Sequence, residues 1–252
     1  MKKEFFGKTK NNESIQKFTL TGGGLIAKFI NWGAVLQDLK FESDSKSLVL
    51  GLEKLEDYIK HSRYFGATAG PYANRIDSGR FRINESEIQL QTNFQKKHHL
   101  HGGTEGVGRR AWNVDEVAKN ELKLSIIHPD GHMGYPGPIL INATFSLLDS
   151  GILDIVYKAE TEKTTIVNLA HHSYFNLSGE KTILEHELKI NASTFLEVDE
   201  GLIPRGEPQS VEVGGHDFRD FRRIKNESGK ISNLDHNYCL SLNPQEIRPV
   251  AW

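Results

Sequence analysis

A regular alternation of apolar and polar residues at positions 139–148 constrains the fold more than any other feature of the sequence. The polar positions include Asn142, Thr144 and Ser146. The apolar positions are Ile139, Ile141, Ala143, Phe145 and Leu147. Successive side chains of a β-strand point to opposite faces, so this pattern predicts a strand with one face in the core and the other partly exposed.

The same period of two recurs on both sides of this segment. The flanking apolar positions are Leu122, Leu124 and Ile126 before it and Leu153, Ile155, Tyr157 and Ala159 after it. The tripeptide Asp-Ser-Gly at residues 149–151 has the composition of a tight turn between two strands. We therefore expect an antiparallel meander.

Helical signals are few. Leu52, Leu55 and Ile59 have helical spacing and predict one short helix over residues 52–59. Short alternating runs and glycine-rich turns, such as residues 22–24, fill the remainder, and no linker interrupts the chain. The sequence predicts an all-β protein, a large sandwich with one concave face, as a single domain over residues 1–252.

Residues 166–177 combine alternation with unusual chemistry. The pattern predicts a strand with Val167, Leu169, Phe175 and Leu177 on one face and Asn168, His172, Tyr174 and Asn176 on the other. The second face holds uncharged or weakly ionising hydrogen-bonding groups, which are typical of a carbohydrate cleft. The alternative is an ordinary solvent-facing surface that lacks Lys and Glu by chance.

The charge balance argues against polyanionic partners. The chain has 31 Lys and Arg against 33 Asp and Glu, a formal net charge of −2, so it offers no basic field for nucleic acid or an anionic membrane. No apolar segment follows the basic start, and no run is long enough for a membrane span. With Cys239 as its one cysteine, the sequence predicts a cytoplasmic protein.

Three polar clusters hold the candidate catalytic groups. They are Gly-Pro-Tyr-Ala-Asn-Arg-Ile at residues 70–76, His-His-Leu-His-Gly-Gly at 98–103 and His-His-Ser-Tyr-Phe-Asn-Leu at 171–177. An imidazole can give or take a proton near neutral pH, so His101 and His172 are candidate acid or base groups. For either histidine alone, a hydrogen-bonded structural role is the alternative.

A metal site is a further alternative. His99 and His101 share one side of a predicted strand, and Glu105 follows at a spacing reminiscent of the first motif of metal cupins. The second cupin motif is absent, because no histidine stands at the expected position after residues 136–138. Two histidines and one carboxylate are a sparse ligand set.

The order of the motifs resembles the sequence of aldose 1-epimerases (galactose mutarotases). Besides the three clusters, the matching segments are residues 31–34, 50–51, 130–137, 199–204, 218–219 and 234–238. Together they cover essentially the whole chain. The resemblance implies the galactose-mutarotase-like β-supersandwich, the interconversion of α and β anomers of an aldohexose such as galactose or glucose, and no cofactor or metal.

Position by position, the resemblance assigns roles to particular residues. It implies that His172 is the proton donor and His101 the second catalytic histidine. The implied sugar-binding residues are Asn74, Arg75, Tyr174 and Asp235. Two local departures are Pro71, where many members have arginine, and Ala170-His171, which replaces the usual Thr-Asn.

The family's general base has no counterpart in this sequence. That base is a glutamate in a Glu-Thr-Gln-like motif on a late strand, and nothing in residues 243–252 resembles this motif. Glu246 lies in a segment that matches the region before the motif, so we give it no role. The expectation is a chain that is incomplete at its C-terminus and lacks the last strands of the sheet.

Three hypotheses follow from these observations. The first is an aldose 1-epimerase in an incomplete copy, which the apolar ending at Trp252 favours. The second is a truncated sugar-binding homologue without turnover, since Asn74, Arg75, His101 and Asp235 are all retained. The third is a metal enzyme through His99, His101 and Glu105.

Overall fold

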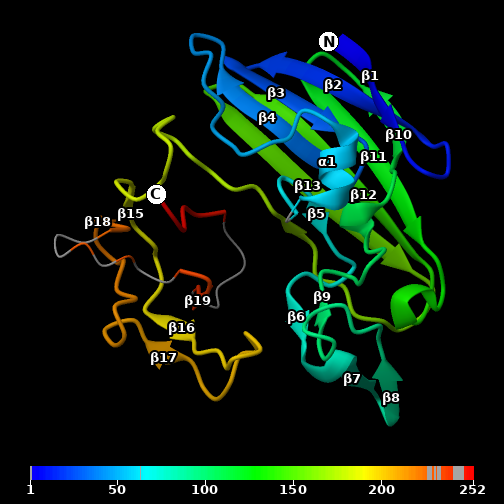
Figure 1. The fold of residues 1–252 in the computed structure, drawn as a ribbon, viewed down its shortest axis with the longest axis vertical. Coiled ribbons are helices and arrows are strands. Elements are labelled where there is room, and N and C mark those ends of the chain that lie inside the picture. The colour runs from blue at the N-terminus through cyan, green and yellow to red at the C-terminus, as the bar shows by residue number, and fades with distance from the viewer. Residues whose placement is uncertain (1, 63, 226–228, 230, 232–233, 241–246) are drawn as a thin grey trace. The chain divides into compact units, whose positions relative to one another are not determined.

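The chain is described by a computed structural model that covers residues 2–62, 64–225, 229, 231, 234–240 and 247–252. It divides into two compact units, Met1–Gly179 and Glu180–Trp252. In both units nearly all regular elements are strands, which confirms the all-β class (Figure 1). A single domain over residues 1–252 stays a prediction, and Glu246 lies outside the described residues.

The predicted meander is a four-stranded antiparallel sheet of the first unit, with the order β10-β11-β12-β13. β12 spans Ile139–Leu148 as predicted, and its five alternate apolar side chains are at most 1% exposed. It pairs with β13 along its whole length, and residues 149–151 form the turn between them. The other strands are β10 (Asn113–Val117), β11 (Glu121–His128) and β13 (Ile152–Thr161).

A second four-stranded sheet of this unit has the order β1-β2-β3-β4. Its strands are β1 (Lys2–Lys8), β2 (Ser14–Gly22), β3 (Leu25–Ile30) and β4 (Val35–Phe41). Gly23 and Gly24 form the predicted turn between β2 and β3, with φ angles of 57° and 81°. A Cβ atom on Gly23 would collide with the carbonyl oxygen of Leu148 at the end of β12, so this close approach requires glycine.

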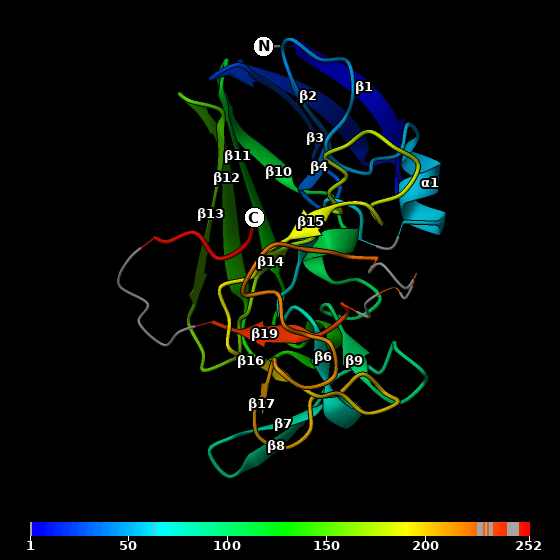
Figure 2. The same cartoon turned by 90° about the vertical axis from the view of Figure 1, so that its left-hand side faces the viewer.

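The core of the first unit lies between these two sheets (Figures 1 and 2). Phe29 on β3 packs against Phe145 on β12, with ring centroids 4.6 Å apart, and both side chains are fully buried. The buried Trp112 satisfies its indole N–H by donating to the Val107 carbonyl at 2.9 Å. Such aromatic side chains each bury about 150–250 Å² and account for much of the stability of a core.

The predicted helix is α1 (Leu55–Lys60), which begins later than the pattern suggested. The Leu52 amide donates to the Tyr58 hydroxyl oxygen at 3.0 Å, and this bond holds Leu52 outside the helix. Short elements complete the unit. They are the pairs β5 (Thr68–Ala69) with β14 (Ala170–His171), β6 (Arg75–Ile76) with β9 (His99–Leu100) and β7 (Arg80–Ile83) with β8 (Ser86–Gln89), and the 3₁₀ turns Asp77–Gly79, Val107–Arg109 and His132–Gly134.

Residues 166–177 do not form the predicted continuous strand, and that prediction is wrong. The segment changes its pairing partner along its length. Asn168 bridges to Tyr72, β14 pairs with β5, and Phe175 bridges to Val49. Most of the expected apolar face lies outside the core, since Val167, Phe175 and Leu177 are 39%, 51% and 62% exposed. Leu169, the fourth residue of that face, is partly buried and packs against the core. A local alternation specifies extended backbone, whereas the partner of each residue depends on distant segments.

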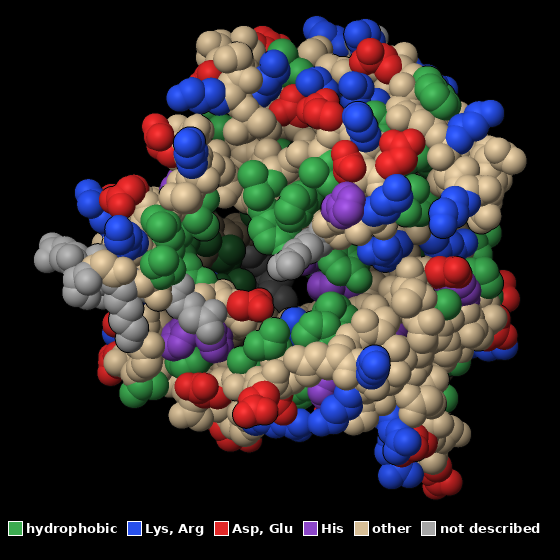
Figure 3. Space-filling model, in the orientation of Figure 1, with side chains coloured by type: hydrophobic (Ala, Val, Ile, Leu, Met, Phe, Trp, Pro, Cys, Tyr) green, Lys and Arg blue, Asp and Glu red, His purple; other side chains and the backbone are tan. Residues whose placement is uncertain are grey.

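Charges of both signs are mixed on the molecular surface. On the face drawn in Figure 3, Lys and Arg side chains are interspersed with Asp and Glu. This distribution agrees with the net charge of −2. Within the described ranges, none of the helices has the length and apolar character that crossing a membrane requires.

The second unit contains much shorter strands. They are β15 (Glu187–Leu188) paired with β18 (Arg222–Arg223), and β16 (Thr194–Leu196) between β17 (Gln209–Ser210) and β19 (Asn237–Cys239). Phe195 on β16 is fully buried, and the His216 ring stacks on it with centroids 4.0 Å apart. The rings of His236 and Tyr238 also contact Phe195, at 5.6 and 6.5 Å.

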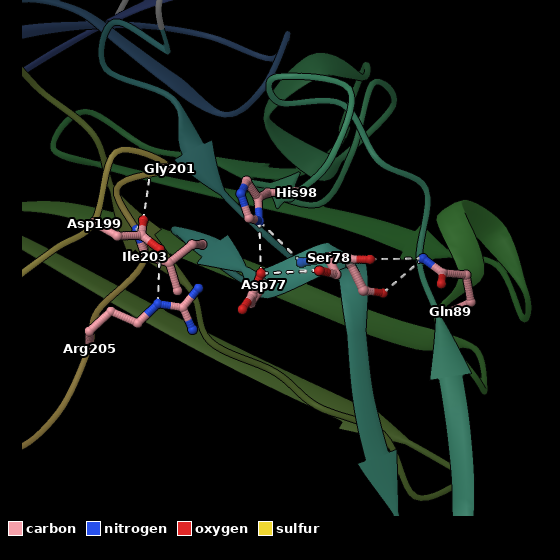
Figure 4. A network of polar contacts seen from close by, with 9 residues as sticks. Asp77, Ser78, Gln89, His98, Asp199, Gly201, Ile203 and Arg205 are labelled. Carbon is pink, nitrogen blue, oxygen red and sulfur yellow. Dashed lines mark hydrogen bonds and ion pairs between the residues drawn. The ribbon is translucent and has the colours of Figure 1, made fainter.

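A side-chain-supported turn follows β16 in this unit (Figure 4). The Asp199 carboxylate accepts from the amides of Gly201 and Ile203 at 2.8 and 3.0 Å and from Nε of Arg205 at 2.8 Å. Hydrogen bonds from the Ile203 amide and from Arg205 favour the ionised form, so they hold the pKa of Asp199 below its usual value.

Candidate active site

Asn74 and His101 face each other at the ends of a short antiparallel pair in the first unit. Arg75 and Leu100 are paired residues of β6 and β9, which brings Asn74, just before β6, opposite His101, just after β9. The His101 amide donates to the Asn74 carbonyl at 3.1 Å, and the Asn74 amide donates to Nδ1 of His101 at 2.9 Å. Two residues from separate clusters of the sequence are therefore joined by two hydrogen bonds.

The hydrogen bond from the Asn74 amide determines the tautomer of His101. A backbone amide can only donate, so Nδ1 accepts and the proton of the neutral ring lies on Nε2. Burial, helped by the nearby charges of His172 and Arg75, lowers the pKa of His101 to about 3. At neutral pH the ring is therefore uncharged, with Nε2–H available as a hydrogen-bond donor.

His172 is fixed to the same unit by its main chain. Its amide donates to the Ala67 carbonyl at 2.9 Å, and its carbonyl accepts from the Gly66 amide at 3.0 Å. The His172 ring meets the His101 ring edge to face, with centroids 5.1 Å apart and an interplanar angle of 85°. The fold thus brings together the two histidines that the sequence predicted as catalytic.

Tyr174 extends this group of rings. Its ring lies 5.2 Å from the His172 ring and 5.1 Å from the Phe65 ring. The Tyr174 carbonyl accepts from the Leu50 amide at 2.9 Å, and the side chain stays 39% exposed. A phenol beside His172 that remains accessible fits the predicted role in substrate contact.

Arg75 lies next to Asn74 through a side-chain bond. Nη1 of Arg75 donates to Oδ1 of Asn74 at 3.0 Å. The guanidinium also packs over the ring of Phe94, 4.5 Å from its centroid. A guanidinium with its carbons and one face against an aromatic ring has fewer accessible orientations, so its remaining donors have a defined direction.

The loop that carries His101 is supported from behind by a buried histidine. The His98 side chain is 1% exposed, and Nδ1 lies 3.1 Å both from the Ser78 amide and from Oδ1 of Asp77 (Figure 4). Gln89 donates to the Ser78 carbonyl at 3.2 Å in the same network. These contacts tie β9 to the neighbouring turn at Asp77–Gly79.

Asp235 belongs to the second unit, where its side chain is exposed. It precedes β19 by two residues, and the hydrogen-bonded pairing of β19 with β16 fixes that strand. Its predicted contact with sugar hydroxyls stays a prediction, as do the roles of the other candidate residues.

The structure gives no support to the metal hypothesis at His99, His101 and Glu105. Nδ1 of His99 lies 2.6 Å from the Gln91 carbonyl and Nε2 lies 2.7 Å from the Tyr135 hydroxyl, so both ring nitrogens have protein partners. Nδ1 of His101 is occupied by the Asn74 amide. Within the part of the chain that is described, His, Cys, Asp and Glu form no group of three or more suited to a metal ion.

Sequence reasoning missed two residues of this region, Tyr64 and Phe94. The Tyr64 ring lies 4.5 Å from the His101 ring, and Phe94 backs Arg75. Both stand in irregular segments where side-chain direction has no period. An aromatic residue close in sequence to a polar cluster was the available signal, but it does not reveal which side chain the ring contacts.

Comparison with known proteins adds independent evidence. The family model described as aldose 1-epimerase matches residues 16–249. A galactose mutarotase from Pongo abelii is 38% identical over 234 residues, which cover 90% of this chain and 68% of that protein. An aldose 1-epimerase from Haemophilus influenzae is 35% identical over 228 residues, covering 86% of this chain and 66% of that protein.

Solved structures agree with the sequence relatives. An aldose epimerase homologue from C. elegans superposes with a TM-score of 0.85 at 28% identity, covering 93% of this chain and 74% of that one. A galactose 1-epimerase from Lactobacillus acidophilus gives a TM-score of 0.83 at 28% identity, covering 99% of this chain and 76% of that one. These neighbours confirm the expected galactose-mutarotase-like fold, and together with the family match they establish that the chain belongs to the aldose 1-epimerase family.

Proposed function

We propose that this chain interconverts the α and β anomers of an aldohexose, such as galactose or glucose, by acid–base opening of the sugar ring. Family membership supports the reaction type. The observation that carries the proposal is the edge-to-face pair of His101 and His172, in which one ring is held neutral with a known donor nitrogen. Two imidazoles in contact, one of them held neutral, can take different roles in one proton transfer.

In the proposed reaction, His172 as the imidazolium donates a proton to the ring oxygen while the C1 hydroxyl loses one. The C1–O5 bond breaks, the open-chain aldehyde rotates about C1–C2, and the ring closes on the other face. Nε2–H of His101 donates to a sugar oxygen that gains negative charge. A positioned acid of this kind contributes about 10²–10⁴ in rate. The role of the base that removes the C1 proton is not assigned to a residue of this sequence.

The sugar-orienting groups have complementary chemistry. The neighbouring side chains of Arg75 and Asn74 supply several N–H donors and one amide carbonyl acceptor. An Asp235 carboxylate supplies acceptors only. A hexose presents adjacent hydroxyl groups that both donate and accept. We therefore propose Asn74, Arg75, Tyr174 and Asp235 as its binding residues.

The proposed cellular location is the cytoplasm. The described residues include one cysteine, Cys239, which carries a free thiol. A reducing compartment keeps such a thiol intact. Aldohexose conversion in carbohydrate metabolism fits the same location.

Exchange spectroscopy by NMR tests the function directly. We expect the protein to accelerate exchange between the C1 protons of α- and β-galactose or glucose, and His172→Ala to reduce the rate at least about 100-fold. His61→Ala is the matched control, because His61 is an exposed histidine of the same unit and should leave the rate unchanged. Saturable sugar binding without any acceleration would support the alternative, a sugar-binding homologue without turnover.

A further inference from the structure

Tyr64 contacts both histidines of the candidate active site, although it belongs to none of the three clusters. It lies in the loop between α1 and β5, and its ring is 4.5 Å from the His101 ring and 5.8 Å from the His172 ring. Since the two histidine rings are themselves 5.1 Å apart, the three rings form a triangle in which each contacts the other two.

The backbone at Tyr64 is held in a costly conformation. Its φ of 62° lies in the left-handed region, which costs a bulky side chain more than it costs glycine. Such a conformation persists where neighbouring contacts determine it. Here the Tyr64 carbonyl accepts from the Ala67 amide, and the Phe65 amide donates to the Ser62 hydroxyl, both at 3.0 Å.

The residues just after Tyr64 are joined to the main chain of His172. The Gly66 amide donates to the His172 carbonyl, and the His172 amide donates to the Ala67 carbonyl. The Tyr64 ring and the His172 ring therefore project from two backbone segments that are bonded to each other. This arrangement leaves the Tyr64 ring little freedom to move relative to His172.

Tyr64 also borders a very small cavity. Tyr64, Tyr58, Ser62 and Arg109 help line a cavity of about 10 Å³, which has room for a single water molecule and none for a sugar. Burial raises the pKa of Tyr64, and the nearby Arg109 charge only partly opposes this effect. The phenol therefore stays neutral at physiological pH, so its ring rather than its ionisation is available to the site.

We propose that Tyr64 is a positioning residue whose ring fixes the distance and the edge-to-face angle between His101 and His172. Any consequence for catalysis rests on the function proposed above. The effect arises because the ring occupies the third corner of the triangle. Without this ring, the imidazole of His101 keeps its hydrogen bond from the Asn74 amide. The His172 ring, however, loses a neighbour that restricts its orientation.

Three variants separate the ring of Tyr64 from its hydroxyl and from its backbone. Tyr64→Phe keeps the ring, Tyr64→Leu replaces it with an aliphatic group, and Tyr64→Gly removes the side chain while relieving the left-handed strain. We expect Tyr64→Phe to keep kcat within about 3-fold of wild type. Tyr64→Leu and Tyr64→Gly should lower kcat at least about 10-fold with KM within about 3-fold, because orientation of the acid matters in the transition state.

Tyr58→Leu is the matched control. Tyr58 lines the same cavity and is buried, but its ring contact is with Phe6 and its hydroxyl oxygen accepts from the Leu52 amide. The substitution should lower the unfolding temperature at least as much as Tyr64→Leu while kcat stays unchanged. An equal loss of kcat in Tyr58→Leu would overturn the positioning role, because general destabilisation would then explain both variants.

A structural readout tests the placement without using activity. Nuclear Overhauser effects between ring protons of His101 and His172 report their proximity, and we expect them in wild type and Tyr64→Phe but weakened in Tyr64→Leu and Tyr64→Gly. Unchanged effects in both ringless variants would refute the proposal, as would a loss of kcat in Tyr64→Phe equal to that in Tyr64→Leu. If wild type fails to accelerate anomer exchange, the proposed function fails, and the NMR comparison still decides the role of Tyr64.

Discussion

Different interactions stabilise the two units of this chain. In Met1–Gly179, strands of up to ten residues pair over long registers, and the apolar faces of two sheets bury one continuous core. In Glu180–Trp252, the named strands have two or three residues, and the buried Phe195 is surrounded by aromatic and imidazole rings.

This difference shows which substitutions should destabilise each unit most. Long ladders distribute stability over many equivalent backbone bonds, whereas short strands depend on individual side chains such as Phe195 and Asp199. The candidate histidines lie in the first unit, but two-residue strand pairs hold them rather than the long ladders. Variants in each unit can refute this difference in the source of stability or measure its size.

The largest effect should come from removing one buried ring in each unit. We expect both Phe145→Ala and Phe195→Ala to cost about 3–5 kcal/mol, because each ring is fully buried. Hydrogen exchange should show lost protection through both sheets of the first unit for Phe145→Ala. For Phe195→Ala the loss should be confined to residues 180–252.

Exposed Phe221 offers a control for the second unit, since Phe221→Ala should change stability by no more than about 0.5 kcal/mol. Loss of protection across both units in Phe195→Ala would break the comparison, because the second unit would then not be a separate cooperative element.

The second prediction concerns how the unfolding free energy of each unit depends on pH. For each histidine, we expect a smaller effect than that of removing a buried ring. Burial lowers the pKa of both His128 and His171 to about 4 in the first unit, so these rings are neutral when folded. The unfolded chain takes up protons first, near pH 6.5, and each histidine's stabilisation is fully present above that pH and lost as the pH falls towards 4. The loss should be on the order of 3 kcal/mol per histidine, since one pKa unit corresponds to about 1.4 kcal/mol.

In the second unit a carboxylate adds a window at lower pH. The Arg219 side chain lowers the pKa of Asp217 to about 2, so the contribution of Asp217 is present above its usual pKa and is lost only as the pH falls from about 4 towards 2. Urea unfolding from pH 7 to pH 2, followed by hydrogen exchange, measures the two windows. His128→Gln should flatten the dependence of the first unit, and an equal pH dependence of that unit in His128→Gln and wild type would contradict the assignment.

The smallest effect concerns one turn of the second unit. In Asp199→Ala, the amides of Gly201 and Ile203 lose their acceptor, and their protection against hydrogen exchange should fall about tenfold. Asp220→Ala, at an exposed aspartate of the same unit, should leave these amides unchanged. Equal protection in Asp199→Ala and wild type would show that backbone pairing, not the side chain, orders this turn.

The sequence predicted the parts of the fold whose signal is local. β12 was predicted with its observed bounds because its core face alternates over ten residues, and the turn after it was recognised from its composition. Residues 166–177 were mispredicted because their extended backbone pairs with three distant segments. Alternation reports which way a side chain points, but it does not report which strand lies beside it.

The candidate site was only partly accessible from the sequence. The clusters around Asn74, His101 and His172 were found from their composition, the resemblance assigned roles to their residues, and the fold brings these three residues together. The tautomer of His101 depends on an amide 27 residues away in the chain, and the role of Tyr64 depends on a left-handed loop. Neither property has a residue pattern, because both arise from three-dimensional contacts.

The order of strands in the sheet β10-β11-β12-β13 has a consequence for folding kinetics. Every pair in this sheet joins strands that are consecutive in the chain, so each closes a short loop at low entropic cost. The pairing of His171 with Thr68 instead closes a loop of about 100 residues. The sheet can therefore form early from local contacts, whereas the histidine pair is assembled late, by a pairing that must first close this long loop.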